Sequence, residues 1–386
     1  MRSAPLTLAR ALVGTVVTSS LLSLPTFGQA PQPRGSWLWV TTAEQGWDSN
    51  VLYVADSAAA RDFIRRINST VQITKVRSRG SLTFVGTGAV LFYDTAKVLN
   101  TLSFNLQASG TYKLGARTNL LAATSFGRQL VGEVSGTVSN PLLSRALQTT
   151  LTFTGGLEHR LTPFVTGIIG TSYSRVRFDR IGFIQGNVVT GAGSLKKRFR
   201  TRGAVALLAD VSQGAALGVA LQTQTLAAAW QPQFQFVRSM LFDFRGGVTR
   251  SATGSAAAVY APTGSVTLAD TVGKGLLTIG ATRSVAQGFG FGILLVTTAE
   301  AASYTFQARR GNFVTLSATN QESKATGSQL GPTGRLFSRG FSGNVRRVFR
   351  NGVTIGGGTS YRFRDDVVRA TGYSVQLQAG FALGSR

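Results

Sequence analysis

The stretch Leu102–Lys113 reads LSFNLQASGTYK, and small or apolar residues alternate with polar ones along its whole length. One face of this stretch consists of Leu102, Phe104, Leu106, Ala108, Gly110 and Tyr112. The other face consists of Ser103, Asn105, Gln107, Ser109, Thr111 and Lys113. A period of two indicates a β-strand with one apolar and one polar side, and it does not fit the 3.6-residue period of a helix.

The same alternation recurs in Leu147–Glu158 and Tyr373–Leu383. These runs last ~10–12 residues, which is the length of a tilted transmembrane strand and exceeds the ~5–6 residues of a typical soluble one. Their polar face carries Ser, Thr, Gln and Gly, whereas the solvent face of a soluble sandwich would need charges. We therefore predict an all-β fold, a single antiparallel up-and-down transmembrane barrel, and disfavour the alternative of a soluble sandwich.

Composition agrees with a barrel. Charged residues make up 14% of the 386 residues, against ~25% in ordinary soluble domains. The most apolar segments, Ala215–Trp230 and Phe289–Tyr304, are interrupted by polar residues and are poor candidates for a membrane helix. A chain that crosses a membrane without helices must form a closed barrel, because only closure satisfies every backbone polar group in lipid.

The N-terminus resembles an export signal. Arg2 and Arg10 supply a positive start, and the apolar run Ala11–Leu24 follows. We expect residues 1–30 to be a signal peptide and residues 31–386 to form one outer-membrane barrel domain in a Gram-negative cell.

Strand number follows from the connections. Short basic or Gly/Pro-marked turns are expected at Arg77–Gly80, Leu114–Arg117, Arg160–Pro163, Lys196–Gly203, Gln231–Gln233, Gly273–Gly275, Arg309–Asn312 and Arg350–Gly352. Other connections are expected near Asp56–Asp62, Tyr93–Asn100, Val131–Ser144, Phe178–Gly186, Ser212–Ala216, Ser251–Ala256, Gln287–Phe289, Glu322–Thr333 and Asp365–Arg369. Together they predict about 18 strands, an even number as in other single-chain barrels, with the short turns facing the periplasm. Sixteen is the alternative, because Asp210–Met240 can be divided in two ways.

The early part of the chain resembles a known family. The matching features are the strand end Gly46–Tyr53 (GWDSNVLY), the motif Arg61–Ile64, the alternating strand Asn68–Lys75 and the turn Y-x-L-x-x-R-T at Tyr112–Thr118. They are similar to the putative beta-barrel porin 2 family of Gram-negative outer-membrane proteins. The resemblance covers about the first hundred residues after the signal peptide.

This resemblance implies an outer-membrane barrel, often encoded with exopolysaccharide genes, and it supplies no catalytic residues. Outer-membrane lipids, the barrel-assembly machinery and polysaccharide-export components are the partners it implies, and a homo-oligomer is compatible with the sequence. One departure concerns assembly. The chain ends on Gly384-Ser385-Arg386, where such barrels usually end on an aromatic residue that the assembly machinery reads.

Successive side chains of a strand point to opposite sides, and this alternation (strand parity) assigns a set of charged side chains to the lumen or its rim. They are Arg66, Glu158, Asp210, Asp243, Arg245, Arg309, Arg346, Arg362 and Arg364. Basic residues dominate this set, and the net charge of the chain is +25, so we expect a basic lumen that favours anions. Two alternatives stay open. Arg245 pairs with Asp243 in the first. In the second, a group of basic residues are only solvated turn residues: Arg77, Arg79, Lys196, Lys197, Arg198, Arg200 and Arg202.

Other classes of function find little support. The chain has no Cys, and His159 is its single His, so thiolate and multi-His metal sites are excluded and a catalytic triad is disfavoured. The acidic pair Asp365-Asp366 and the glycines Gly356–Gly358 are more simply a solvated loop and strand residues. Dispersed basic charge without a recognition motif argues against nucleic-acid binding. We expect no enzyme activity, metal or cofactor.

The sequence thus predicts a porin-like channel for small hydrophilic or anionic solutes. The alternative is a conduit or accessory of an exopolysaccharide export system, since a basic lumen would also suit an acidic glycan. A third class, a structural or adhesive barrel with a blocked lumen, is disfavoured by the short outer loops.

Overall fold

The computed structural model describes most of the chain after the expected signal peptide. The described ranges are 35–51, 59–130, 146–179, 185–199, 203–216, 219–232, 240–254, 257–288, 293–325, 335–349, 351–365 and 369–385. The expected signal peptide, the loop Val131–Ser144 and the chain end at Arg386 lie outside these residues.

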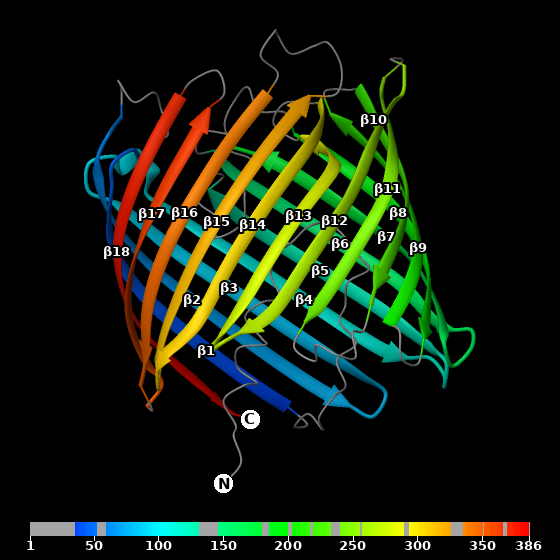
Figure 1. Cartoon of the computed structure of the whole chain (residues 1–386), viewed down its shortest axis with the longest axis horizontal. Coiled ribbons are helices and arrows are strands. Elements are labelled where there is room, and N and C mark those ends of the chain that lie inside the picture. The colour runs from blue at the N-terminus through cyan, green and yellow to red at the C-terminus, as the bar shows by residue number, and fades with distance from the viewer. Residues whose placement is uncertain are drawn as a thin grey trace.

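An 18-stranded antiparallel sheet closes on itself to form a barrel (Figure 1). Its strands are β1 (Gly35–Asp48), β2 (Asp62–Arg77), β3 (Gly80–Tyr93), β4 (Thr101–Lys113), β5 (Thr118–Leu130), β6 (Leu147–Arg160), β7 (Val165–Phe178), β8 (Gly186–Phe199), β9 (Gly203–Ala216), β10 (Val219–Gln231), β11 (Leu241–Thr253), β12 (Val259–Val272), β13 (Gly275–Gly288), β14 (Ile293–Arg309), β15 (Asn312–Ala325), β16 (Arg335–Val348), β17 (Val353–Asp365) and β18 (Arg369–Ser385). Each strand pairs with its sequence neighbours, and β1 pairs with both β2 and β18. The predicted all-β barrel and its 18 strands are confirmed.

The alternative of 16 strands is wrong. Residues 210–240 contribute to two separate strands, β9 and β10, which pair without a register shift from Val219 opposite Ala216 to Gln231 opposite Ala204. The expected loop Ser212–Ala216 is therefore part of β9. Likewise, β8 extends through Phe199, so that Lys196, Lys197 and Arg198 are strand residues and not turn residues. Sequence reasoning missed both extensions because basic and small polar residues are tolerated at strand ends.

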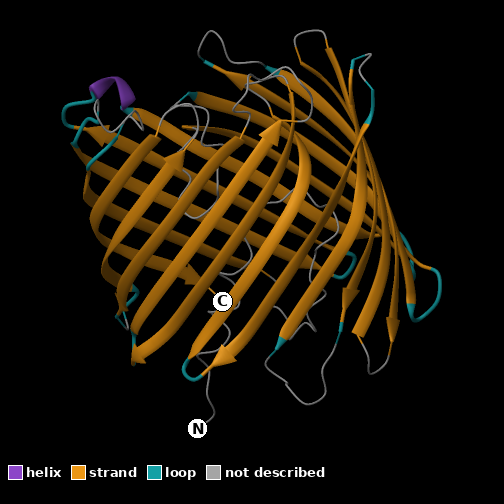
Figure 2. Cartoon of the chain, turned by 45° about the horizontal axis from the view of Figure 1, so that its top comes forward, coloured by secondary structure: helices purple, strands orange, loops and turns teal. Residues whose placement is uncertain are grey.

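The two ends of the barrel differ. β1 begins and β18 ends at the same end of the barrel, where Trp37 lies opposite Ser385. We call this end the turn end, since the expected short turns lie there. The opposite end, the loop end, carries the short 3₁₀ helix η2 (Lys97–Leu99), which lies on the rim (Figure 2). The strands are 13 to 17 residues long, and about 9–11 residues suffice for a tilted strand to cross a bilayer. No helix in the described part of the chain is long and apolar enough to cross a membrane.

Alternation gives the barrel wall an apolar side and a polar side. On β4 the exposed residues Leu102, Leu106 and Tyr112 lie on the apolar side, with 58%, 43% and 46% of their surface exposed. On β18, Tyr373 and Leu377 are exposed in the same way. Residues opposite one another in neighbouring strands share a side, so the register carries this assignment around the wall. Large exposed apolar side chains belong on the lipid-facing surface of a membrane barrel, which leaves the polar side for the lumen.

Hydroxyl groups connect the strands on the polar side. Oγ of Ser317 lies 2.6 Å from Oγ of Ser342, and Oγ of Ser360 lies 2.7 Å from Oγ of Ser374. Other hydroxyl pairs of this kind are Ser81–Thr111, Thr152–Ser174, Ser212–Thr223, Thr225–Thr249, Thr297–Ser323 and Thr305–Thr315. Cross-strand pairs stabilise a sheet, and these also give the lumen a neutral hydrogen-bonding surface.

Candidate functional site

Arg66 and Arg362, both expected in the lumen, lie on the polar side near the loop end and contact carboxylates of β1. Nη1 of Arg66 lies 3.7 Å from Oε2 of Glu44, the residue opposite it. Oε1 of Glu44 also accepts a hydrogen bond of 3.1 Å from Nδ2 of Asn68. Glu44 and Asp48 stand four residues apart on β1, so both side chains point to the same side of the strand.

Arg362 reaches across a whole strand to its partner. Its Nη2 donates a hydrogen bond to Oδ2 of Asp48, which is almost fully buried. Arg362 is on β17 and Asp48 on β1, with Gly372 of β18 between them. A side chain added at Gly372 would be directed toward the Arg362 guanidinium and the Asp48 carboxylate, each 3.9 Å from its Cβ. The glycine thus leaves room for an ion pair that ties together the first and the last two strands.

Arg245 and Asp210 form a second pair on the other part of the wall. Nη2 of Arg245 on β11 lies 3.6 Å from Oδ1 of Asp210 on β9. On the connecting strand, β10, Thr225 lies opposite Asp210, and the small residues Ala227 and Ala229 lie on the same side between it and Arg245. The alternative in which Arg245 pairs with Asp243 is therefore wrong. A residue two positions along a strand is about 6.6 Å away, while a small-residue strand lets a long side chain cross it.

Asp243 belongs instead to a chain of polar contacts near the turn end. Its Oδ2 accepts a hydrogen bond from Nε2 of Gln231. Oε1 of Gln231 in turn accepts one of 2.9 Å from Nζ of Lys196. Lys196 was expected at a turn. It follows exposed Leu195 on β8, so alternation places its side chain on the polar side of the wall. This alternation is the signal in the sequence that identifies Lys196 as a residue of the polar side.

The remaining predicted residues lie apart from these pairs. Arg346 is on the polar side near the turn end, with its guanidinium carbon 5.7 Å from the centre of the Phe313 ring. Glu158 accepts a 3.5 Å hydrogen bond from Asn119. Arg364 follows Arg362 on the same side of β17. Arg309 lies at the turn-end rim, where a register shift after Gln307 interrupts the alternation.

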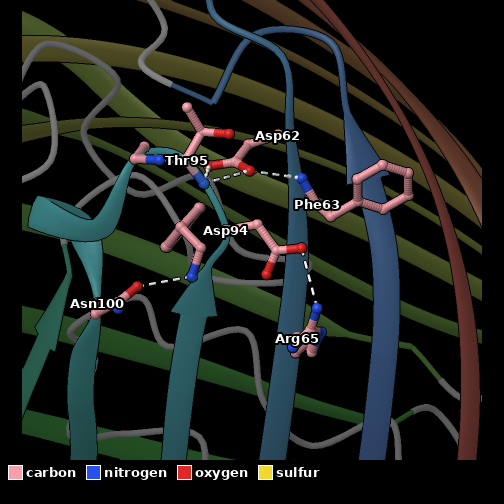
Figure 3. A network of polar contacts seen from close by, with 8 residues as sticks. Asp62, Phe63, Arg65, Asp94, Thr95 and Asn100 are labelled. Atoms are coloured by element: carbon pink, nitrogen blue, oxygen red, sulfur yellow. Dashed lines mark hydrogen bonds and ion pairs between the residues drawn. The ribbon is translucent and has the colours of Figure 1, made fainter.

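At the loop end, a buried carboxylate holds a connecting loop against the barrel mouth (Figure 3). Asp62, 4% exposed, accepts hydrogen bonds from the backbone N–H groups of Phe63 (2.8 Å), Thr95 (3.0 Å) and Ala96 (2.6 Å). Beside it, Oδ2 of Asp94 lies 3.0 Å from Nη2 of Arg65. The sequence singled out the motif around Asp62 only as a family resemblance, and the hydrogen bonds give it a structural role.

The same loop closes over an apolar cluster. Val51, Leu91, Tyr93 and Leu99 are buried against one another at the mouth, with at most 3% of any of them exposed. Leu91 and Tyr93 lie on the polar side of β3, opposite in parity to exposed Phe92. The inward-facing residues Leu91 and Tyr93 of β3 are therefore covered at this end of the barrel.

The described residues include no group of three or more His, Cys, Asp or Glu placed to hold a metal ion. Nδ1 of His159 lies 2.8 Å from the hydroxyl oxygen of Thr118 near the turn end. Both residues are on the apolar side, since Thr118 shares the parity of exposed Leu120. The histidine is thus a strand residue remote from the lumen.

A closed 18-stranded barrel with a hydroxyl-rich polar side invites comparison with known membrane barrels. Residues 25–207 match a protein-family model described as putative beta-barrel porin 2. The resemblance seen in the sequence is confirmed. No curated protein matches the chain in sequence.

Solved outer-membrane porins share the fold. Pseudomonas aeruginosa OccK2, crystallised in complex with glucuronate, is 11% identical, with a TM-score of 0.50 over 91% of this chain and 98% of OccK2. P. aeruginosa OpdQ is 7% identical, with a TM-score of 0.51 over 91% and 98%. Acinetobacter baumannii OccAB4 is 9% identical, with a TM-score of 0.50 over 92% and 99%. The chain therefore has the barrel fold of these outer-membrane porins.

Proposed function

We propose that this protein is a porin-like channel of the outer membrane that passes small hydrophilic solutes and favours anions. The observation that carries the proposal is the polar side of the wall, which carries both cross-strand hydroxyl pairs and ion pairs. Such a lining offers hydrogen bonds to a hydrated solute at many heights of the barrel. A barrel of this strand number is wide enough for a channel.

The preference for anions is expected to be modest. Arg66, Arg245 and Arg362 each contact a carboxylate, and a paired arginine contributes less to the potential along a pore than an isolated one. Among the described residues, Lys196 contacts the neutral amide of Gln231, which links it to Asp243, and Arg346 lies over the Phe313 ring, so neither makes a direct ion pair. These two lie near the turn end, so the positive potential is expected to be strongest there.

Orientation follows from the two ends. An outer-membrane barrel places short turns in the periplasm and longer loops outside, so the turn end is assigned to the periplasm. Export by the expected signal peptide, insertion by the barrel-assembly machinery and contact with outer-membrane lipids belong to this proposal.

Planar-bilayer recording tests the channel directly. The mature chain is refolded, inserted into a bilayer, and its conductance and reversal potential are measured across a KCl gradient. Steady conductance steps with a reversal potential on the anion side support the proposal. Glucuronate, a small carboxylate, then replaces chloride as a test anion. A well-folded barrel without any conductance, or one selective for cations, contradicts it.

The alternative of an exopolysaccharide conduit stays a prediction. No contact among the described residues favours a glycan over a small solute.

A further inference from the structure

Three arginines gather on the apolar side of the wall near the loop end. Arg128 of β5 and Arg177 of β7 both lie opposite Thr149 of β6, and Arg175 lies opposite Leu151. All three arginines are exposed. Since neighbouring strands are about 4.8 Å apart, the Cα atoms of Arg128 and Arg177 are about 10 Å apart. Their guanidinium groups are within reach of a single head group.

These arginines have no partner of opposite charge within the described part of the chain. The nearest carboxylate along the sequence, that of Asp179, accepts a hydrogen bond of 2.9 Å from the backbone N–H of Leu147. Some other basic residues on the apolar side lie over aromatic rings, as Arg339 does over Phe337 at 4.6 Å. The feature of this cluster is that three cations without a carboxylate partner gather on two strands of one side of the wall.

On the turn-end side of the cluster, an apolar groove of about 550 Å³ runs along the apolar side of the wall across strands β3 to β8. Phe153 and Tyr173 lie on its edge, and Tyr173 precedes Arg175 by two residues on the same side of β7. The floor is made of small residues that face one another across strands: Gly110, Ala122, Gly155 and Thr171. Because these residues are small, the groove has room for an aliphatic chain beside the arginines.

We propose that the arginine cluster and the groove form a binding site for an anionic lipid with a phosphate head group. The phosphate lies between Arg128, Arg175 and Arg177, and an acyl chain lies in the groove. Arginine suits phosphate because its planar guanidinium donates two parallel hydrogen bonds to the anionic oxygens. The groove distinguishes a lipid from a free phosphate ion, which would have no use for an apolar floor.

Two substitutions separate the halves of the site. In the triple variant R128Q/R175Q/R177Q the charges are lost and the side chains stay similar in size. In G155L a side chain fills the groove, and the Cβ at Gly155 has no atom within 4 Å, so the substitution fits the wall. The charge control is K197Q/R339Q/R347Q, whose basic groups lie over aromatic rings. The groove control is G88L, since Gly88 is also open but lies outside the groove.

Binding is measured on the refolded mature chain in neutral detergent by native mass spectrometry. The probes are dioleoylphosphatidic acid, dioleoylphosphatidylcholine and inorganic phosphate. Each variant is first shown to be folded by its heat-modifiable migration on a gel. Wild-type protein is expected to retain phosphatidic acid in preference to the other two probes. Because several cations act together on the head group, the triple variant is expected to bind it roughly ten- to a hundredfold more weakly.

G155L is expected to weaken phosphatidic acid binding severalfold, while both control variants bind like wild type. Equal retention of phosphatidic acid by wild type and the triple variant overturns the proposal that the three arginines form a binding site. Equal binding of inorganic phosphate and phosphatidic acid, or an unchanged affinity in G155L, overturns the assignment to a lipid. The proposed channel is judged separately, because all these substitutions lie on the apolar side and leave the lumen and its conductance unchanged.

Discussion

The guanidinium of Arg362 on β17 donates a hydrogen bond to the carboxylate of Asp48 at the end of β1, with β18 passing between them. The pair joins residues 314 positions apart in sequence, and it lies where the closing strands of the barrel meet. The second oxygen of Asp48 accepts a 2.9 Å hydrogen bond from the backbone N–H of Asn50. One buried carboxylate thus secures both the closure of the barrel and the start of the first connection.

Substitution of Asp48 is expected to destabilise this closure. D48N keeps an acceptor for Asn50 but removes the charge that Arg362 contacts. We expect a loss of about 2 kcal/mol in the free energy of unfolding, because hydrogen bonds to charged groups in buried positions contribute about 1.5–3 kcal/mol. The measurement is urea unfolding of the protein in lipid vesicles. R65Q, which breaks the exposed pair with Asp94, is the control and is expected to cost no more than about 0.5 kcal/mol. Similar losses in the two variants would show that the closure pair has no special weight.

The pair Arg245–Asp210 predicts that removing either charge shifts the reversal potential of the channel in opposite directions. R245Q leaves the Asp210 carboxylate without its partner and is expected to move the reversal potential toward cation selectivity. D210N leaves the arginine and is expected to move it toward anions, since fixed charges at a pore wall attract counter-ions. The double variant D210N/R245Q restores the balance and is expected to lie near wild type. If no member of this cycle changes the reversal potential, the pair does not face the ion pathway.

Close approach of β10 and β11 depends on Gly247. A Cβ at this position would lie 2.2 Å from the carbonyl oxygen of Leu226 and 2.6 Å from Cβ of Ala227. G247A is therefore expected to push the two strands apart and to cost about 1–3 kcal/mol, the usual range for overpacking. G191A is the matched control, because a Cβ at Gly191 has no atom within 4 Å. Thermal unfolding followed by heat-modifiable migration compares the two, and equal midpoints would contradict the expected strain.

The loop anchored by Asp62 offers a test by proteolysis. D62A removes the acceptor of three backbone N–H groups, two of which belong to Thr95 and Ala96 in the β3–β4 connection. Because unsatisfied buried amides are unfavourable, the connection is expected to open and expose Lys97 to trypsin. The rate of cleavage after Lys97 is expected to rise about tenfold or more, the effect of about 1.4 kcal/mol. D94N, which breaks only the exposed pair with Arg65, serves as the control. Cleavage at the wild-type rate in D62A would show that other contacts hold the loop.

Strand pattern and connections were readable from the sequence for local reasons. The alternation in Leu102–Lys113 reports which side of a strand each residue takes, and Gly-, Pro- and Arg-rich turns divide the strands. Where residues at a strand end are small or basic, as in Ser212–Ala216 and Lys196–Arg198, these local signals fail. Hydrogen bonds to neighbouring strands, which a single stretch of sequence does not display, decided those boundaries.

Site residues divide in the same way. Parity alone placed Arg66, Asp210, Arg245 and Arg362 together on one side of the wall, because side-chain direction depends only on position along a strand. It did not identify their partners. The proximity of Arg245 to Asp243 in sequence suggested the wrong pair, since an extended strand separates such residues while the alanines of β10 open a route to Asp210.

By itself, the sequence determined an all-β barrel and the side each residue takes, because these follow from a period of two. The pairing of β9 with β10 was needed to decide between 16 and 18 strands. Only the tertiary structure decided that Arg362 contacts Asp48 and that Arg128, Arg175 and Arg177 form one cluster. The physical reason is register. The alignment of each strand with its neighbours, and the closure of β18 onto β1, bring together side chains from strands that the sequence keeps apart.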